Sequence, residues 1–224
     1  MKILVLADIH NDVENIFQYL DKAEKISFDM IICPGDFTDI PPKGFTKEEI
    51  GKVIIEALKS FNKPLLAVPG NWDETIIKLF EKEGMSVHGK GKLIENVGFY
   101  GFGGAKTPFN TSFEPDEKEI EKGLSKALRE VKDAEYKVQI THNPPKGTKL
   151  DMLSSGMHVG SFVVRKFIEE VSPIAAVCAH IHEAKGTDII GNTKIINPGR
   201  FPEGYCGVLE INQGKVDSKL VSLI

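Results

Sequence analysis

Seven side chains in this sequence are of types that bind divalent metal ions, and they occur in short motifs in one order along the chain. The motifs are Asp8-x-His10, Gly35-Asp36, Gly70-Asn71, a lone His142 and His180-x-His182. Carboxylate, imidazole and amide groups in this number can hold two divalent ions side by side. Two ions about 3.5–4 Å apart can share a bridging hydroxide and clamp the attacking and leaving oxygens of a phosphoryl displacement. The residue types therefore indicate chemistry on phosphate esters.

A site of this kind needs one carboxylate that can bridge both ions, and Asp36 suits that role. Gly35 precedes it at the end of a predicted strand, where the missing side chain lets backbone and metal approach closely. Asp8 and His10 stand two apart on an extended segment, so their side chains project to the same side and can bind one ion together. The two histidines of the last motif have the same spacing and support the same inference.

The remaining two ligands complete a second set. Asn71 offers an amide oxygen without adding negative charge, and His142 adds an imidazole. Each motif taken singly also has a structural explanation, because Gly-Asp and Gly-Asn pairs are common in turns and histidines also serve in caps and cores. The order of all the motifs, and their shared position after apolar runs, favour the metal site.

The elements that must position these residues follow from the hydrophobic pattern. Each motif comes directly after a short apolar run that predicts a buried strand, at residues 3–7, 30–33, 65–68, 138–141 and 174–179. Apolar residues at helical spacing predict helices within 13–23, 50–61, 120–131 and 162–171, and Thr46 with Glu49 predicts a capping box. A hairpin at 92–102 and four short strands between 187 and 221 complete the pattern. The alternation of strands and helices predicts an α/β fold with the ligands at one edge of a sheet.

Composition narrows the class of protein. With 224 residues and 41% hydrophobic content, we expect one domain over residues 1–224. The formal net charge of −4 gives no overall basic field, so nucleic acid is not an expected partner. Cys33 and Cys178 lie in apolar runs and the total of three cysteines is odd, which favours a reducing compartment. No apolar run approaches membrane-spanning length, and we expect a cytoplasmic protein without membrane contact.

The ordered motifs resemble the calcineurin-like metallophosphoesterase superfamily, and the resemblance covers nearly the whole chain. Residues 157–161 and 196–199 look like the small prokaryotic branch described as phosphodiesterase-related. The resemblance implies a four-layer α/β/β/α sandwich of two mixed β-sheets flanked by helices. It also implies two sets of ligands, Asp8, His10, Asp36 and His182 for the first metal and Asp36, Asn71, His142 and His180 for the second. Family members use manganese, iron, zinc, nickel or cobalt. We expect two divalent ions in this protein, with manganese as the leading candidate.

One position departs from the family pattern. Many superfamily phosphatases carry a histidine directly after the Gly-Asn, where it is thought to protonate the leaving group, but this chain has Trp72. An indole cannot supply that proton. We hypothesise that His158, on a glycine-flanked loop, replaces the missing acid. Asp73 is expected either to orient a ligand or to cap the following helix.

Three further features have two explanations each at the level of sequence. Arg200 is a candidate phosphate clamp, because a guanidinium matches two phosphate oxygens, or else an ordinary surface arginine. His88 is expected to be structural or exposed, in a short edge strand. The pair Gly103-Gly104 is expected either to leave open space beside the metals or to form a tight turn.

The leading hypothesis is a dinuclear metal-dependent phosphoesterase in which a metal-bridging hydroxide attacks phosphorus, with Asp36, His158 and Arg200 in the catalytic machinery. Small phosphodiesters and activated phosphomonoesters are the expected substrates, because good leaving groups need least protonation. An alternative is a protein-interaction scaffold with little or no catalysis, as a retromer subunit uses this fold. A nuclease is a third interpretation, which the net charge disfavours. A homodimer through exposed helices or edge strands would be ordinary.

Overall fold

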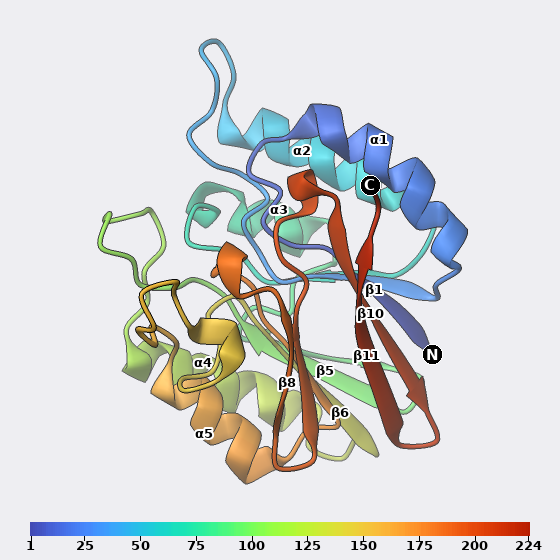
Figure 1. Ribbon diagram of the computed structural model, residues 1–224, viewed down its shortest axis with the longest axis vertical. Coiled ribbons are helices and arrows are strands. Elements are labelled where there is room, and N and C mark those ends of the chain that lie inside the picture. Colours follow the sequence, from blue (N-terminus) through green and yellow to red (C-terminus); the bar gives the residue numbers. More distant parts are fainter.

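Two β-sheets pack face to face in the computed structural model, which describes residues 1–224 (Figure 1). In spatial order, the five strands of the first sheet are β11 (Lys215–Ser222), β10 (Tyr205–Asn212), β1 (Lys2–Val5), β2 (Met30–Cys33) and β3 (Leu65–Ala67). The six strands of the second sheet are β4 (Gly91–Ile94), β5 (Val97–Phe102), β6 (Tyr136–Thr141), β7 (Ala175–Val177), β9 (Thr193–Asn197) and β8 (Gly186–Ile190). In the first sheet, β1, β2 and β3 pair in parallel, whereas β10 and β11 are antiparallel to their neighbours. In the second sheet, β5, β6, β7 and β9 pair in parallel and the edge strands β4 and β8 pair antiparallel, so both sheets are mixed.

Helices cover the outer face of each sheet. They are α1 (Val13–Ala23), α2 (Lys47–Lys59) and α3 (Ile77–Lys82) on the first sheet, and α4 (Glu117–Glu130) and α5 (Phe162–Val171) on the second (Figure 1). The predicted capping box is present, because the Thr46 hydroxyl accepts from the Glu49 amide while the Glu49 carboxylate accepts from Thr46. The four-layer α/β/β/α sandwich expected from the sequence is confirmed. None of the helices combines the length and the apolar composition that crossing a bilayer requires.

Alternate residues of the central strands face different layers, and this alternation builds the core. In β1, Leu4 packs under the helices of the first sheet, whereas Ile3 and Val5 pack between the two sheets. Leu124 and Phe167 join a third cluster between the second sheet and its helices. Because strands such as β1 are covered on both sides, they appear as continuous apolar runs in the sequence.

The parallel strands of both sheets end at one edge, and the polar motifs follow them there. β1 leads to Asp8, β2 to Asp36, β3 to Asn71, β6 to His142 and β7 to His180. The fold therefore brings together residues that are up to 172 positions apart in the sequence, as between His10 and His182. The remaining question is how closely their side chains meet.

One local expectation from the sequence is corrected, and one pair of alternatives is separated. His88 does not lie in an edge strand, because Ser86 and His88 form only isolated bridges, one to β3 and one to β5. Gly103 does not leave open space, since a Cβ there would lie 2.1 Å from the Pro69 carbonyl oxygen. Gly104 has a φ of +79°, so the pair forms a closely packed turn.

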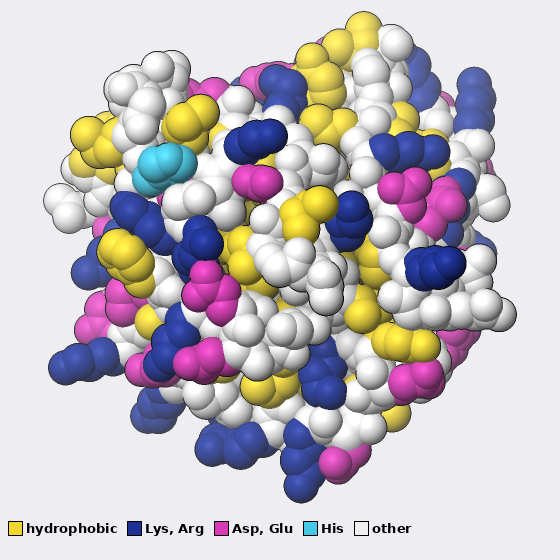
Figure 2. Space-filling view, turned by 60° about the horizontal axis from the view of Figure 1, so that its bottom comes forward, with side chains coloured by type: hydrophobic (Ala, Val, Ile, Leu, Met, Phe, Trp, Pro, Cys, Tyr) yellow, Lys and Arg dark blue, Asp and Glu magenta, His cyan; other side chains and the backbone are white.

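The surface and the cysteines fit the composition. All three cysteines are free and buried. On the face that Figure 2 shows, Lys and Arg side chains are interspersed with Asp and Glu side chains and with hydrophobic ones. That face presents no continuous basic surface of the kind that binds a nucleic acid backbone.

Candidate metal centre

Six of the seven predicted ligands form two groups whose ligand atoms lie within 4.8 Å of one another. The first group is Asp8, His10 and His182, and the second is Asp36, His142 and His180. The division matches the two sets that the family resemblance implied. Each group combines one carboxylate with two imidazoles, a donor set that suits borderline divalent ions.

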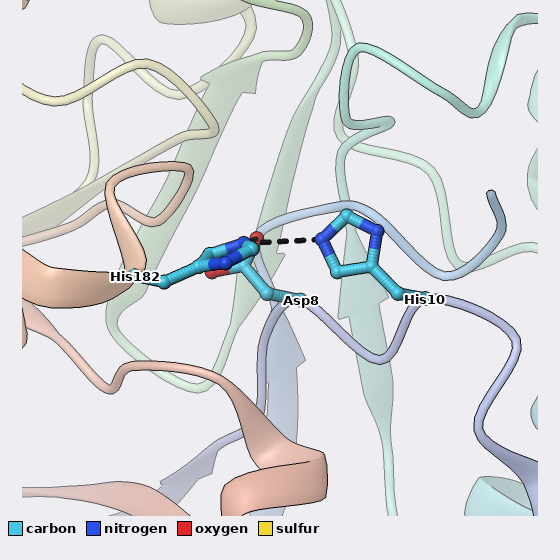
Figure 3. Close-up of side chains that lie close together, drawn as sticks. All are labelled: Asp8, His10 and His182. Carbon is cyan, nitrogen blue, oxygen red and sulfur yellow. Dashed lines mark hydrogen bonds and ion pairs between the residues drawn. The ribbon is translucent and has the colours of Figure 1, made fainter.

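In the first group, two imidazoles meet from opposite sides over a carboxylate (Figure 3). The Nε2 atoms of His10 and His182 are 3.1 Å apart, and the His182 Nε2 lies 3.8 Å from Asp8 Oδ1. Two nitrogen ligands at right angles on one ion, each at about 2.1 Å, would lie roughly 3 Å apart. The observed separation therefore suits two ligands of a single ion.

The second group is more deeply buried. The His142 Nε2 lies 3.3 Å from Asp36 Oδ2 and 3.0 Å from the Asn71 amide oxygen, and the His142 and His180 ring centroids are 5.0 Å apart. The seventh predicted ligand, Asn71, thus stands at this group. Side-chain exposure is 0% for His142 and 2% for Asp36, so the polar atoms here meet one another rather than water.

Asp36 connects the two groups. Its Oδ2 lies 3.3 Å from the His142 Nε2 and 3.6 Å from the His10 Nε2. Its other oxygen, Oδ1, accepts a hydrogen bond of 3.1 Å from the Trp72 main-chain amide. One carboxylate oxygen is therefore fixed by the backbone while the other faces both groups.

In two of the imidazoles, the Nδ1 atom, which is not the nitrogen nearest the other ligands, lies beside an oxygen atom of the protein. The His142 Nδ1 donates to the Pro34 carbonyl oxygen over 2.8 Å, which leaves the Nε2 of the neutral ring free as a ligand. The His10 Nδ1 lies 3.2 Å from Asp39 Oδ2, within ion-pair distance but without hydrogen-bond alignment. Asp39 was not singled out from the sequence; its position three residues after Asp36 was the only signal.

The loops that carry the ligands have unusual backbone conformations. Asp8, His10, Asp36 and His180 all have positive φ angles between 49° and 72°. A non-glycine residue in this left-handed region costs about 1–2 kcal/mol. The surrounding structure must maintain these conformations, which four of the six grouped residues share.

Two glycines allow the loops to approach one another. A Cβ at Gly35 would lie 2.6 Å from the Gly70 amide nitrogen, and a Cβ at Gly70 would lie 2.0 Å from Asp36 Oδ1. A larger side chain at Gly35 would collide with Gly70 and with the His142 ring, and one at Gly70 would displace Asp36. The glycine in each Gly-Asp and Gly-Asn motif is thus explained by close packing at the centre.

Asp73 joins the Asp36 and Asn71 loops. Its buried carboxylate accepts hydrogen bonds from the main-chain amides of Phe37, Thr38 and Gly70, at 2.9–3.1 Å, and from the Thr38 hydroxyl. It makes no cap bond to the following turn. Of the two roles expected for Asp73, the structure therefore shows the orienting one.

In the metal-free protein, burial and neighbouring charges shift the pKa values of the ionisable groups in the centre. Burial raises the pKa of Asp8 to about 7. Burial works against a charged His142, but the Asp36 carboxylate outweighs it and raises the pKa of that imidazole to about 9. Burial lowers the pKa of His180 to about 3 and that of His182 to about 4. Bound cations would favour the deprotonated form of every one of these groups.

The residues present fit divalent ions. Asp8 Oδ2 is a buried acceptor without any hydrogen-bond partner, which is costly unless a cation satisfies it. The rings of His10, His142 and His182 each place a nitrogen 3.3–3.8 Å from a carboxylate oxygen. The donor set, its burial and its orphaned oxygen therefore agree with the predicted ions, and leave their identity open.

Three residues that the sequence singled out are not ligands, and they differ in how they contact the centre: Trp72, Arg200 and His158. Trp72 contacts Asp36 through its main chain, and the Lys47 Nζ lies 5.1 Å from its ring centroid. Arg200 forms a bridge with Ala7, and its charge contributes to the lowered pKa of His182 after burial and His10. The His158 Nδ1 contacts Asp151 Oδ1 at 2.7 Å, and no hydrogen bond or ion pair joins His158 to the seven ligands.

A cavity of about 590 Å³ begins beside the first group. Asn11, which directly follows His10, is one of its lining residues, and the exposed ring of Phe45 is another. The loop that carries Phe45 is tied back to the centre, because Asn11 accepts from the Asp39 amide and donates to the Ile40 carbonyl oxygen. The cavity is mainly apolar and holds none of the predicted ligands.

Known proteins resemble this chain both in sequence and in structure. The sequence model of the family described as calcineurin-like phosphoesterase matches residues 1–184. The uncharacterized protein MJ1162 of Methanocaldococcus jannaschii is 35% identical over 214 residues, covering 92% of this chain and 90% of that protein. The crystal structure of TT1561 of Thermus thermophilus has a TM-score of 0.74 at 21% identity, covering 100% of this chain and 99% of the other. A dimetal phosphatase from Danio rerio has a TM-score of 0.67 at 10% identity, with coverage of 100% and 96%. These two structures share the fold.

Proposed function

The chain belongs to the calcineurin-like phosphoesterase family, and on that premise we propose that it is a dinuclear metal-dependent phosphoesterase acting on small phosphodiesters and activated phosphomonoesters. The position of Asp36 carries the proposal. Its Oδ2 is the one carboxylate oxygen within 3.6 Å of imidazoles from both groups, as a bridging ligand requires. The two groups of ligands on either side support two ions rather than one.

The proposed ligands are Asp8, His10, Asp36 and His182 for the first ion, and Asp36, Asn71, His142 and His180 for the second. Divalent ions at such a site lower the pKa of water and neutralise charge that develops on the phosphoryl oxygens. The chain itself fixes the donors. The Trp72 amide holds one Asp36 oxygen, and Pro34 fixes the tautomer of His142. This preorganisation means that little rearrangement is needed during the reaction.

Arg200 is the proposed clamp for the phosphoryl group. Its Nε is buried without a hydrogen-bond partner, beside the strand end that carries Asp8. A guanidinium there can donate two parallel hydrogen bonds to phosphate oxygens. An ordinary surface arginine would have its Nε in water.

His158 remains the proposed proton donor for the leaving group. Its Nδ1 lies against the buried Asp151 carboxylate, which leaves the Nε2 without a hydrogen bond in the protein. The main-chain carbonyl of His158 accepts from the Lys146 ammonium, and Ser154 of the same loop donates to Glu183, next to His182. The contact with the residue after His182 supports a position for this loop near the first group, which a proton donor to the leaving group requires.

Substrates with good leaving groups are favoured because Trp72 cannot donate a titrating proton. The cavity beside the first group offers room for an organic group of the ester, and its volume lies in the range of small-molecule sites. Both features favour aryl and other activated esters over simple alkyl monoesters.

The deciding experiment uses metal-stripped protein reloaded with Mn²⁺. Hydrolysis of bis-p-nitrophenyl phosphate is measured beside that of p-nitrophenyl phosphate, with an Asp36→Asn variant as the control. Turnover that requires the metal and falls by about 10³-fold or more in the variant is the expected result. Absence of turnover in protein that holds two ions would overturn the proposal, as would a variant that retains full activity.

A further inference from the structure

Four buried side-chain atoms in the protein have no hydrogen-bond partner, and all four belong to residues in or next to the metal centre. They are Asp8 Oδ2, His10 Nδ1, Asn143 Oδ1 and Arg200 Nε. The first two belong to proposed ligands. Asn143 and Arg200 are not ligands, so bound metal ions would not satisfy them.

Asn143 differs from every other buried amide side chain. Asn71, Gln139 and Asn197 each make at least one side-chain hydrogen bond within the protein. Asn143 is 7% exposed and its amide makes none, through either the oxygen or the nitrogen. Because the amide nitrogen is not among the buried orphaned atoms, it keeps contact with solvent while the oxygen is covered.

Asn143 lies next to the second ligand group in the chain. It directly follows His142 at the end of β6, and the Thr141 hydroxyl donates to its main-chain carbonyl, which fixes the turn. Arg200 forms a bridge with Ala7, the residue before Asp8. The two orphaned groups therefore adjoin different ligand groups, Asn143 the second and Arg200 the first.

A buried polar group without a partner lowers the stability of the folded protein, so its retention calls for an explanation. The orphaned Arg200 Nε is itself an N–H donor, and the unpaired amide nitrogen of Asn143 is a donor that contacts solvent, so both side chains offer N–H groups that suit an anion. The covered Asn143 Oδ1 gains nothing from an anion, so its cost to stability remains. We propose that Asn143 is a substrate-contacting residue whose amide N–H donates to a non-bridging phosphate oxygen, opposite the Arg200 guanidinium. The inference rests on the proposed function, and it assigns to Asn143 a binding role that the metal ligands do not fill.

The test compares Asn143→Ala with a matched control, Gln139→Ala. Gln139 is a buried amide on β6, the strand that leads to Asn143, but it accepts from the Tyr100 hydroxyl and donates to the Val164 carbonyl oxygen. Three quantities are measured on manganese-loaded protein: the dissociation constant of inorganic phosphate by calorimetry, the bound metal, and the melting temperature. The kcat and KM for bis-p-nitrophenyl phosphate are measured alongside.

For Asn143→Ala, we expect unchanged metal content, phosphate binding about 10-fold weaker, and a melting temperature equal to or above that of the wild type. For Gln139→Ala, we expect the reverse: a lower melting temperature, because two buried hydrogen bonds are lost, and unchanged phosphate binding by the folded protein. Loss of phosphate affinity without loss of stability separates a substrate contact from a structural role.

Unchanged phosphate affinity in Asn143→Ala would overturn the inference, whether or not the melting temperature of that variant falls as far as that of Gln139→Ala. Failure of the proposed function is a different result. Wild-type protein that binds phosphate through Asn143 yet hydrolyses no ester would keep the binding role and remove the phosphoesterase.

Discussion

The two ligand groups contain the same types of donor but lie in different surroundings. Both have one carboxylate and two imidazoles, yet the His182 side chain of the first group is 37% exposed, whereas His142 of the second is fully buried. The second group also has an amide ligand and a main-chain carbonyl that fixes its histidine. One half of the centre is therefore part of the core, and the other half is partly open to solvent.

This asymmetry has consequences for the ions. An ion in the buried group is held by residues whose positions the core determines, so it should exchange slowly and stabilise the fold. An ion in the open group has a half-exposed ligand and adjoins the 590 Å³ cavity, so it should exchange faster and meet the substrate first. Variants that remove one histidine from each group test this division.

The largest expected effect is the difference between His142→Ala and His182→Ala. Removing His142 leaves the buried Asp36 carboxylate without its nearest imidazole and the Pro34 carbonyl without its donor, which should destabilise the protein by about 3–5 kcal/mol. Removing the half-exposed His182 should cost about 1 kcal/mol or less. Chemical denaturation of both metal-free variants measures these free energies of unfolding.

Metal content provides the second measurement on the same pair. We expect His182→Ala to retain the ion of the buried group and to lose that of the open group, so that about half of the wild-type metal remains. Equal stability losses in the two variants, or loss of both ions from His182→Ala, would show that the centre does not divide into a buried and an open half.

The sequence predicted the members of both groups but not the difference between them. The motifs and their strand-end positions were legible because the parallel strands are buried on both faces and therefore appear as continuous apolar runs. Burial of His142 depends on how the second sheet packs against the first, and no local pattern contains that information. The same limit applies to Asp39, whose position beside His10 arises from contact between loops distant in sequence.

Other expectations failed or stayed open for local reasons. The edge strand at His88 was wrong because the segment crosses between the sheets and forms single bridges to each. The Asp73 alternatives could be separated only by seeing four donors converge on one carboxylate. The capping box at Thr46 was predictable, since both partners lie within one turn of a single helix.

A pH titration of the metal-free protein tests the buried half with a smaller expected effect. Because the Asp36 carboxylate outweighs burial and raises the folded-state pKa of His142 from 6.5 to about 9, this imidazole contributes stability that is complete below pH 6.5. That contribution, roughly 3 kcal/mol, is lost as the pH rises through about 9. The lowered pKa values of His180 and His182 act only below pH 6.5 and so do not offset the loss.

The melting temperature of metal-free protein should therefore fall between pH 7 and pH 9. Manganese-loaded protein is the control, and its melting temperature should stay level or rise over the same interval, since metal binding requires deprotonated ligands. A metal-free melting temperature that rises with pH would show that the Asp36–His142 contact does not hold a proton in the folded protein.

The smallest effect concerns the side of the centre where the usual acid is absent. A Trp72→His variant keeps the main-chain amide that binds Asp36 Oδ1 and adds a titrating group beside the bridge between the two halves. A positioned acid contributes typically 10²–10⁴-fold, but Lys47 lies close to this side chain and would disfavour a protonated imidazole, so we expect only about a 10-fold gain. The gain should appear in kcat/KM for an alkyl phosphomonoester relative to bis-p-nitrophenyl phosphate, because the aryl leaving group needs no proton.

Trp72→Phe is the matched control, since it preserves an aromatic ring without a titrating proton and should leave the ratio of the two kcat/KM values unchanged. An equal rise in both variants would mean that removing the indole opens the site, and that the missing acid does not limit the choice of substrate.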